Sequence, residues 1–148
     1  MKIAIGSDHG AFEYKQEIIK HLTELGHEVK DFGCYSNESC DYPDYILPVA
    51  IAVSKGEYDR GIAMCGTGIG ASITANKVKG IRCALVNDLS VAKVTREHND
   101  SNILSFGARV ISLETAIQIV DVWLNTPFSN EERHIRRINK IKEYENAR

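Results

Sequence analysis

The stretch Gly61-Ile-Ala-Met-Cys65-Gly-Thr-Gly-Ile-Gly70-Ala-Ser-Ile-Thr-Ala-Asn-Lys77 joins a short apolar run to a helix-like segment through three glycines. The run at 61–64 has the pattern of a buried strand, and residues 69–78 have the pattern of a helix. A strand that passes through glycines into a helix leaves backbone N–H groups and the positive end of the helix dipole facing a ligand. Cys65 stands at the mouth of this turn. The stretch therefore predicts a reactive thiol beside an anion-binding loop, an arrangement suited to carbon-acid chemistry on an anionic or oxyanion-forming substrate.

The same alternation of apolar runs and helical patterns extends along the chain. The expected strands are residues 2–6, 28–31, 61–64, 82–86 and 103–106. The expected helices are residues 12–25, 42–54, 69–78, 90–97, 113–124 and 129–146. This order predicts an α/β fold, a three-layer α/β/α sandwich with a five-stranded parallel sheet, doubly wound like the Rossmann and flavodoxin folds.

Ligands of doubly wound sheets bind beyond the carboxyl ends of the strands. Those ends carry Asp8 and His9 after the first strand, Cys65 to Gly70 after the third, and Arg109 after the fifth. His98 and Asn99 are expected in the loop that leads into the fifth strand. These positions define the candidate site.

The last expected helix is unusually polar. It opens with a Ser129-x-x-Glu132 capping-box pattern, and only Ile135, Ile138 and Ile141 form an apolar stripe. A helix of this kind packs weakly on its own chain. We therefore expect a single domain over residues 1–148, whose C-terminal helix (about 129–146) packs on a second copy of the chain.

Composition excludes several classes of protein. The chain has 148 residues and a net charge of −2, which gives no basic footprint for nucleic acid or an anionic membrane. No apolar run approaches the roughly 20 residues that span a bilayer, and the first residues do not form a signal peptide. We expect a cytoplasmic protein. The four cysteines do not have the spacing of a structural zinc site. Because the cytoplasm is reducing, we do not expect them to form disulfides.

Known glycine-loop motifs do not fit. The loop has no lysine where a P-loop needs one, no dinucleotide-binding fingerprint, and Ala71 where a cysteine phosphatase needs arginine. Simpler explanations stay open for each motif. Cys65 could be an inert core thiol, Asp8 a helix cap, His98-Asn-Asp100 a polar loop, and Arg133 with Arg137 a solvated basic face.

Several further segments accompany these residues in a fixed order. They are Gly6-Ser-Asp-His9, Asp41-Tyr-Pro43, Cys65-Gly-Thr-Gly-Ile-Gly70, Ala75-Asn-Lys77, Gly80-Ile-Arg82, His98-Asn-Asp100 with Asn102, Phe106-Gly-Ala-Arg109, and the pair Arg133 and Arg137. Together they make the chain resemble, over essentially its whole length, the B-type ribose-5-phosphate isomerases. One departure is Ser7, where many relatives carry cysteine.

This resemblance implies an aldose–ketose isomerase that interconverts D-ribose 5-phosphate and D-ribulose 5-phosphate in the non-oxidative pentose phosphate pathway, without a metal or organic cofactor. The residue matching Cys65 is the base of a cis-enediolate mechanism, and His98 opens the furanose ring. Thr67, Asp8 and Asn99 contact the sugar. The implied oxyanion hole comprises Gly66, Thr67, Gly68, Ile69 and Gly70, with Tyr42 of the Asp41-Tyr-Pro43 segment also among the substrate-binding residues. The implied phosphate ligands are His9, Arg109, Arg133 and Arg137.

The resemblance also implies a homodimer, or sometimes a tetramer, in which the last helix reaches the neighbour. A sister group of the family acts on six-carbon sugar phosphates such as galactose 6-phosphate, but tends to lack the histidine matching His98. Two alternatives stay open, an isomerase of allose 6-phosphate or galactose 6-phosphate and a non-catalytic sugar-phosphate-binding protein.

Overall fold

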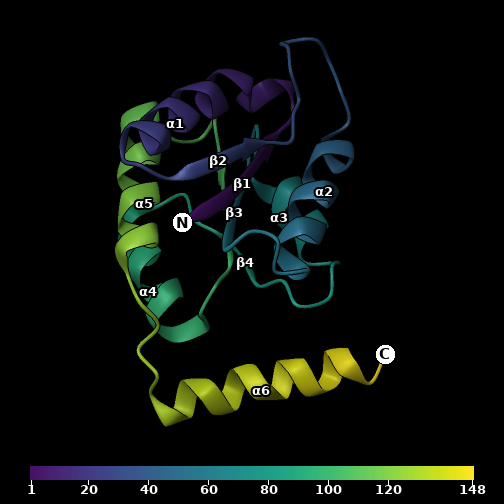
Figure 1. Ribbon diagram of the computed structural model, residues 1–148, viewed down its shortest axis with the longest axis vertical. Coiled ribbons are helices and arrows are strands. Elements are labelled where there is room, and N and C mark those ends of the chain that lie inside the picture. The colour runs from purple at the N-terminus through teal and green to yellow at the C-terminus, as the bar shows by residue number, and fades with distance from the viewer.

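The strands pair in the order β2-β1-β3-β5-β4, and every neighbouring pair is parallel. The computed structural model describes all residues from Met1 to Arg148 (Figure 1). The strands are β1 (Lys2–Ser7), β2 (Glu28–Asp31), β3 (Arg60–Cys65), β4 (Cys83–Leu85) and β5 (Ile103–Gly107). The expected five-stranded parallel sheet is confirmed; its strand order, with β5 between β3 and β4, was not part of the prediction.

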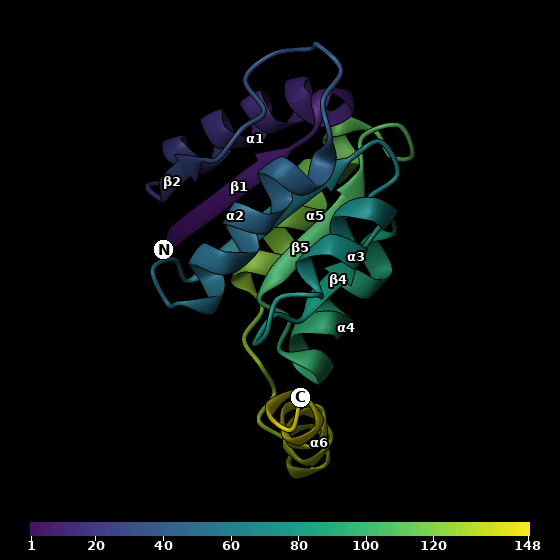
Figure 2. The ribbon, with the colours of Figure 1, turned by 90° about the vertical axis from the view of Figure 1, so that its right-hand side faces the viewer.

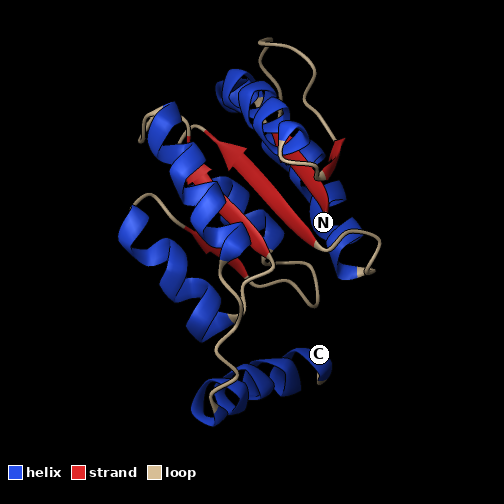
Figure 3. Cartoon of the chain, turned by 60° about the vertical axis from the view of Figure 1, so that its left-hand side comes forward, coloured by secondary structure: helices blue, strands red, loops and turns tan.

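Helices cover both faces of this sheet. They are α1 (Phe12–Glu24), α2 (Tyr42–Ser54), α3 (Ile69–Ala75), α4 (Leu89–Asn99), α5 (Leu113–Asn125) and α6 (Glu132–Asn146), with a 3-10 turn at His9–Ala11 before α1. One apolar core joins the sheet to α1, α4 and α5, and the other joins it to α2 and α3. Figures 2 and 3 show the sheet between these two layers, so the three-layer sandwich is confirmed.

The last helix does not begin where the capping-box pattern places it. The Ser129 hydroxyl donates to the Glu97 carbonyl at 2.7 Å instead of capping a helix, and Asn130 adopts a left-handed φ of 59°. Because of that bend, α6 begins at Glu132, and the expected start at Ser129 is wrong.

Helix α6 stands apart from the two layers, across the amino ends of the strands (Figures 1 and 2). Of its apolar stripe, Ile138 is buried against the rest of the chain, whereas Ile135 and Ile141 are exposed. The helix therefore buries only part of its apolar face within one chain. No helix of the structure combines the length and the apolar character that crossing a bilayer requires.

Candidate active site

Cys65 is the last residue of β3, and its thiol is held by the glycine loop that follows. Its side chain is largely buried, and its Sγ accepts a hydrogen bond from the Gly68 N–H at 3.2 Å. Gly68 has φ of 81°, and a Cβ there would lie 2.7 Å from the Phe106 backbone, so only glycine fits this turn. The thiol thus faces a backbone donor of the glycine loop.

The loop also offers N–H groups that the protein leaves free. The unpaired backbone donors are those of Gly66, Thr67, Gly70 and Ala71. Gly66, Thr67 and Gly70 line the same cavity as Cys65, whereas Ala71 is fully buried. Free donors beside a buried thiol can hold an oxygen atom that gains negative charge during a reaction.

A cavity of about 440 Å³ opens above this loop. Its lining residues are Asp8, Tyr42, Cys65, Gly66, Thr67, Ile69, Gly70, Ile73 and Arg109. The Arg109 guanidinium packs against the backbone of Gly10 and Gly66. A Cβ atom at Gly10 would lie 3.3 Å from a guanidinium nitrogen, and one at Gly66 would lie 3.2 Å from the other. It makes no ion pair within the chain, so it is available to an anion.

Asp8 lines this cavity, and His9 follows it in the turn after β1. The Asp8 carboxylate accepts from the Gly10 N–H at 2.9 Å, so its capping role is confirmed while it also lines the cavity. His9 Nδ1 accepts from the Cys40 N–H at 3.2 Å. In its neutral form, His9 therefore carries its proton on Nε2.

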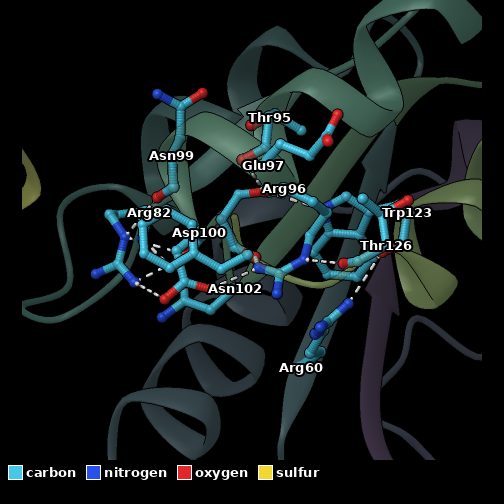
Figure 4. Close-up of polar contacts among 12 residues, drawn as sticks. Arg60, Arg82, Thr95, Arg96, Glu97, Asn99, Asp100, Asn102, Trp123 and Thr126 are labelled. Carbon is cyan, nitrogen blue, oxygen red and sulfur yellow. Dashed lines mark hydrogen bonds and ion pairs between the residues drawn. The ribbon is translucent and has the colours of Figure 1, made fainter. Parts of the chain in front are cut away.

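His98 and Asn99 lie on the last turn of α4, and the prediction of a loop there is wrong. The helix continues because its last carbonyls find side-chain donors: Arg82 Nε donates to the carbonyls of Asn99 and Asp100 at 3.0 and 3.2 Å (Figure 4). Arg96 Nη1 in turn donates to the Asp100 carboxylate at 2.8 Å. Two arginines therefore fix the turn that carries His98.

The same topology separates His98 from Cys65 within one chain. Helix α4 runs back along the sheet, so its end meets the amino end of β5. There Ile103 pairs with Gly61, whereas Cys65 pairs with Gly107 at the carboxyl end. Since each strand residue advances about 3.3 Å, these two levels of the sheet are about 13 Å apart.

A further histidine, which the sequence analysis missed, lies against His98. His134 of α6 stacks on it, with ring centroids 4.3 Å apart. Arg133 Nε donates to His134 Nε2 at 3.3 Å. Burial, together with the charges of His98 and Arg133, lowers the pKa of His134. The sequence could not reveal this residue, because its burial depends on where α6 folds back.

The predicted residues, together with His134, thus form two groups. The thiol cluster comprises Asp8, Tyr42, Cys65, Thr67, Arg109 and the glycine loop, and His9 is next to Asp8 in the chain. The histidine cluster comprises His98, Asn99, Arg133, His134 and Arg137. One chain does not bring the two clusters together, since the cavity above Cys65 contains no residue of the histidine cluster.

Both the sequence and the fold of this chain match those of known proteins. The chain is 48% identical to ribose-5-phosphate isomerase B of Escherichia coli over 147 residues, which cover 99% of this chain and 98% of that protein. Its fold matches the structure of ribose-5-phosphate isomerase B from Clostridium thermocellum with a TM-score of 0.96, at 54% identity and 99% coverage of both chains.

A second solved structure is the Mycoplasma genitalium ribose-5-phosphate isomerase B with bound ribulose 5-phosphate. It matches with a TM-score of 0.94 and 40% identity, covering 98% of this chain and 96% of the other. The family described as Ribose/Galactose Isomerase matches residues 3–141. The chain therefore belongs to the ribose/galactose isomerase family.

Proposed function

We propose that this protein interconverts D-ribose 5-phosphate and D-ribulose 5-phosphate through a cis-enediolate, with Cys65 as the base. The observation that carries the proposal is the Cys65 thiol at the carboxyl end of β3, in one cavity with the free backbone N–H groups of Gly66, Thr67 and Gly70. The same reaction is named for relatives that match this chain over nearly their whole length.

The chemistry follows from the thiol cluster. The Cys65 thiolate takes the C2 proton of the open-chain aldose, and the free N–H groups of the loop stabilise the enediolate oxygens. The resulting thiol returns the proton to C1, while a proton passes from O2 to O1, which gives the ketose. Asp8 and Thr67 hold the sugar oxygens, and Tyr42 borders the cavity over Gly70.

The rest of the reaction needs the histidine cluster. His98 opens the furanose ring by moving a proton between the ring oxygen and the C1 hydroxyl, and Asn99 contacts the sugar. Arg109 and His9 from one side and Arg133 with Arg137 from the other bind the phosphate. Binding at the phosphate orients C1 and C2 against the sulfur.

We propose that a homodimer joins the two clusters, so that each site takes its thiol cluster from one subunit and its histidine cluster from the other. Exposed apolar side chains mark the contact surface. On the body they are Ile69 and Ile73 of α3, Leu85 of the edge strand β4 and Val94 of α4; on α6 they are Ile135 and Ile141. An unpaired edge strand and a half-buried amphipathic helix both need such a partner.

We further place the enzyme in the cytoplasm and its reaction in the non-oxidative pentose phosphate pathway. The four cysteines are all free, as a reducing compartment requires. A tetramer formed from two such dimers is compatible with the proposal.

Mixing two inactive variants tests the shared site. Cys65→Ala removes the base and Arg137→Ala removes a phosphate ligand. If the clusters come from different subunits, a mixed dimer has one site with both changes and one with neither. Random reassembly then restores about a quarter of the wild-type activity, because half of the dimers are mixed and half of their sites are intact.

The control is the double variant Cys65→Ala/Arg137→Ala, mixed with either single variant, which restores nothing above the single variants. No recovery in a sample shown to contain mixed dimers would overturn the shared site. Absence of C2 proton exchange with ribose 5-phosphate in the wild type, measured by NMR in deuterated water, would overturn the proposed reaction. Faster turnover of allose or galactose 6-phosphate would move the protein to the six-carbon branch.

A further inference from the structure

Asn87 lies outside the cavity, two residues beyond β4, yet its side chain is bound at both ends. Its Oδ1 accepts from the Gly107 N–H at 2.8 Å, and its Nδ2 donates to the Thr67 carbonyl at 3.3 Å. The N–H partner identifies the oxygen of the amide and the carbonyl partner identifies its nitrogen. Asn87 therefore links the end of β5 to the glycine loop.

The Thr67 carbonyl belongs to the peptide group that reaches the catalytic thiol. The N–H of this group is that of Gly68, which donates to Cys65 Sγ at 3.2 Å. In a trans peptide, the carbonyl and the N–H are coplanar and point in opposite directions. An anchor on the carbonyl therefore sets the direction of the N–H.

The next peptide group is held in the same way. The buried Ser105 hydroxyl donates to the Gly68 carbonyl at 2.9 Å, and the N–H of this group, that of Ile69, donates to Thr67 Oγ1 at 3.2 Å. Two consecutive peptide groups thus have their carbonyls fixed by side chains beneath the loop. Their N–H groups donate to the thiol and to the Thr67 hydroxyl.

We propose that Asn87 is a positioning residue, which holds the Gly68 N–H on the Cys65 sulfur through the peptide group between Thr67 and Gly68. Glycine at 68 leaves this peptide free to rotate, because a residue without Cβ is permissive on its own. The side-chain anchor removes that freedom. The sulfur then keeps its donor in the resting enzyme and throughout proton transfer.

Two variants separate the parts of this link. Asn87→Asp still accepts from the Gly107 N–H but cannot donate to the Thr67 carbonyl. Asn87→Ala loses both contacts without adding charge. Asn102→Ala is the matched control, since Asn102 also binds two backbone groups, the Arg82 N–H at 2.8 Å and the Gly80 carbonyl at 2.9 Å, but at the amino end of β5.

The first readout does not depend on isomerase activity. Iodoacetamide reacts with the thiolate of Cys65, and mass spectrometry of the peptide that contains Cys65 gives the alkylation rate at each pH. We expect the pH midpoint of this reaction to move upward in both Asn87 variants and to stay unchanged in Asn102→Ala. A midpoint that moves only in Asn87→Asp reports the added charge and overturns the proposal.

The second readout rests on the function proposed above. We expect kcat for ribose 5-phosphate to fall roughly tenfold in both variants while KM changes little, since about 1.4 kcal/mol of transition-state stabilisation is lost. Unchanged alkylation and unchanged kcat in folded Asn87→Ala would overturn the proposal. An inactive wild type whose alkylation midpoint still moves in the variants would overturn the reaction and keep the positioning role.

Discussion

The imidazole rings of His98 and His134 stack with centroids 4.3 Å apart and an interplanar angle of 18°. The pair joins the end of α4 to the first turns of α6, which otherwise makes few contacts with its own chain. His134 is almost fully buried, and Glu131, Arg133 and Arg137 are the charged groups around it. The stack therefore depends on at least one ring staying neutral.

This dependence predicts an acid-sensitive contribution to stability. Burial, then His98 and Arg133, lower the pKa of His134, and they outweigh the opposing carboxylate of Glu131. As the pH falls through about 6.5, the unfolded chain gains a proton on this histidine before the folded chain does, so the stabilisation present at higher pH is lost. Wild type is expected to lose more in Tm between pH 8 and pH 5.5 than His134→Gln. Equal losses in thermal melts of the two proteins would contradict this.

Removal of the thiol is predicted to stop catalysis and leave the fold intact. Cys65→Ala is expected to lower kcat for ribose 5-phosphate at least ~100-fold, the contribution of a positioned base, with little change in Tm. Cys83→Ala is the control: burial raises the pKa of its thiol to about 12, so that thiol is inert near neutral pH. Turnover that survives in Cys65→Ala would eliminate the proposed base.

Ring opening and proton transfer are predicted to separate in His98→Asn. Ribulose 5-phosphate has no furanose ring, so exchange of its C1 proton with deuterated water needs no ring opening by His98. We expect this exchange to persist while net conversion of ribose 5-phosphate falls at least ~10-fold. Proton NMR follows both processes, with His27→Asn as a distant control. Parallel loss of exchange and conversion would argue that His98 acts in proton transfer itself.

The buried ion pair between α1 and β2 predicts an asymmetric loss of stability. Lys15 Nζ is fully buried and lies 2.7 and 2.8 Å from the two Asp31 oxygens. Asp31→Ala leaves that ammonium without a partner and is expected to cost about 3 kcal/mol. Lys15→Met leaves a partly exposed carboxylate that still accepts from the Gly33 N–H, and is expected to cost below about 1.5 kcal/mol. Urea unfolding measures both, and equal losses would refute the asymmetry.

The sheet and its covering helices could be predicted because local patterns decide them. Short apolar runs in regular alternation with helical patterns leave little choice but a covered parallel sheet. The position of Cys65 was equally visible, since it directly follows an apolar run and precedes glycines. The strand order could not be predicted from the sequence, because the position of β5 between β3 and β4 depends on contacts between distant parts of the chain.

The sequence predicted the surroundings of the site residues less well than it predicted the fold. The pattern His98-Asn-Asp100 resembles a loop, but Arg82 and Arg96 supply the donors that extend α4 through Asn99. Asn87 gave no sequence signal at all, because its role consists of two backbone contacts made across the fold. Side chains that act on distant backbone are hidden from pattern and spacing alike.

In the proposed homodimer, the placement of His98 and Cys65 at opposite ends of one sheet ties activity to the amount of protein present. Under the proposed homodimer, a single folded chain holds half of each of two sites and completes neither. Below the concentration at which chains pair, activity per molecule should therefore decline on dilution and return when the sample is concentrated again. The specific activity of the enzyme then rises with its concentration. A cell that contains little enzyme therefore has a flux through the reaction that is lower than proportional to the amount of enzyme.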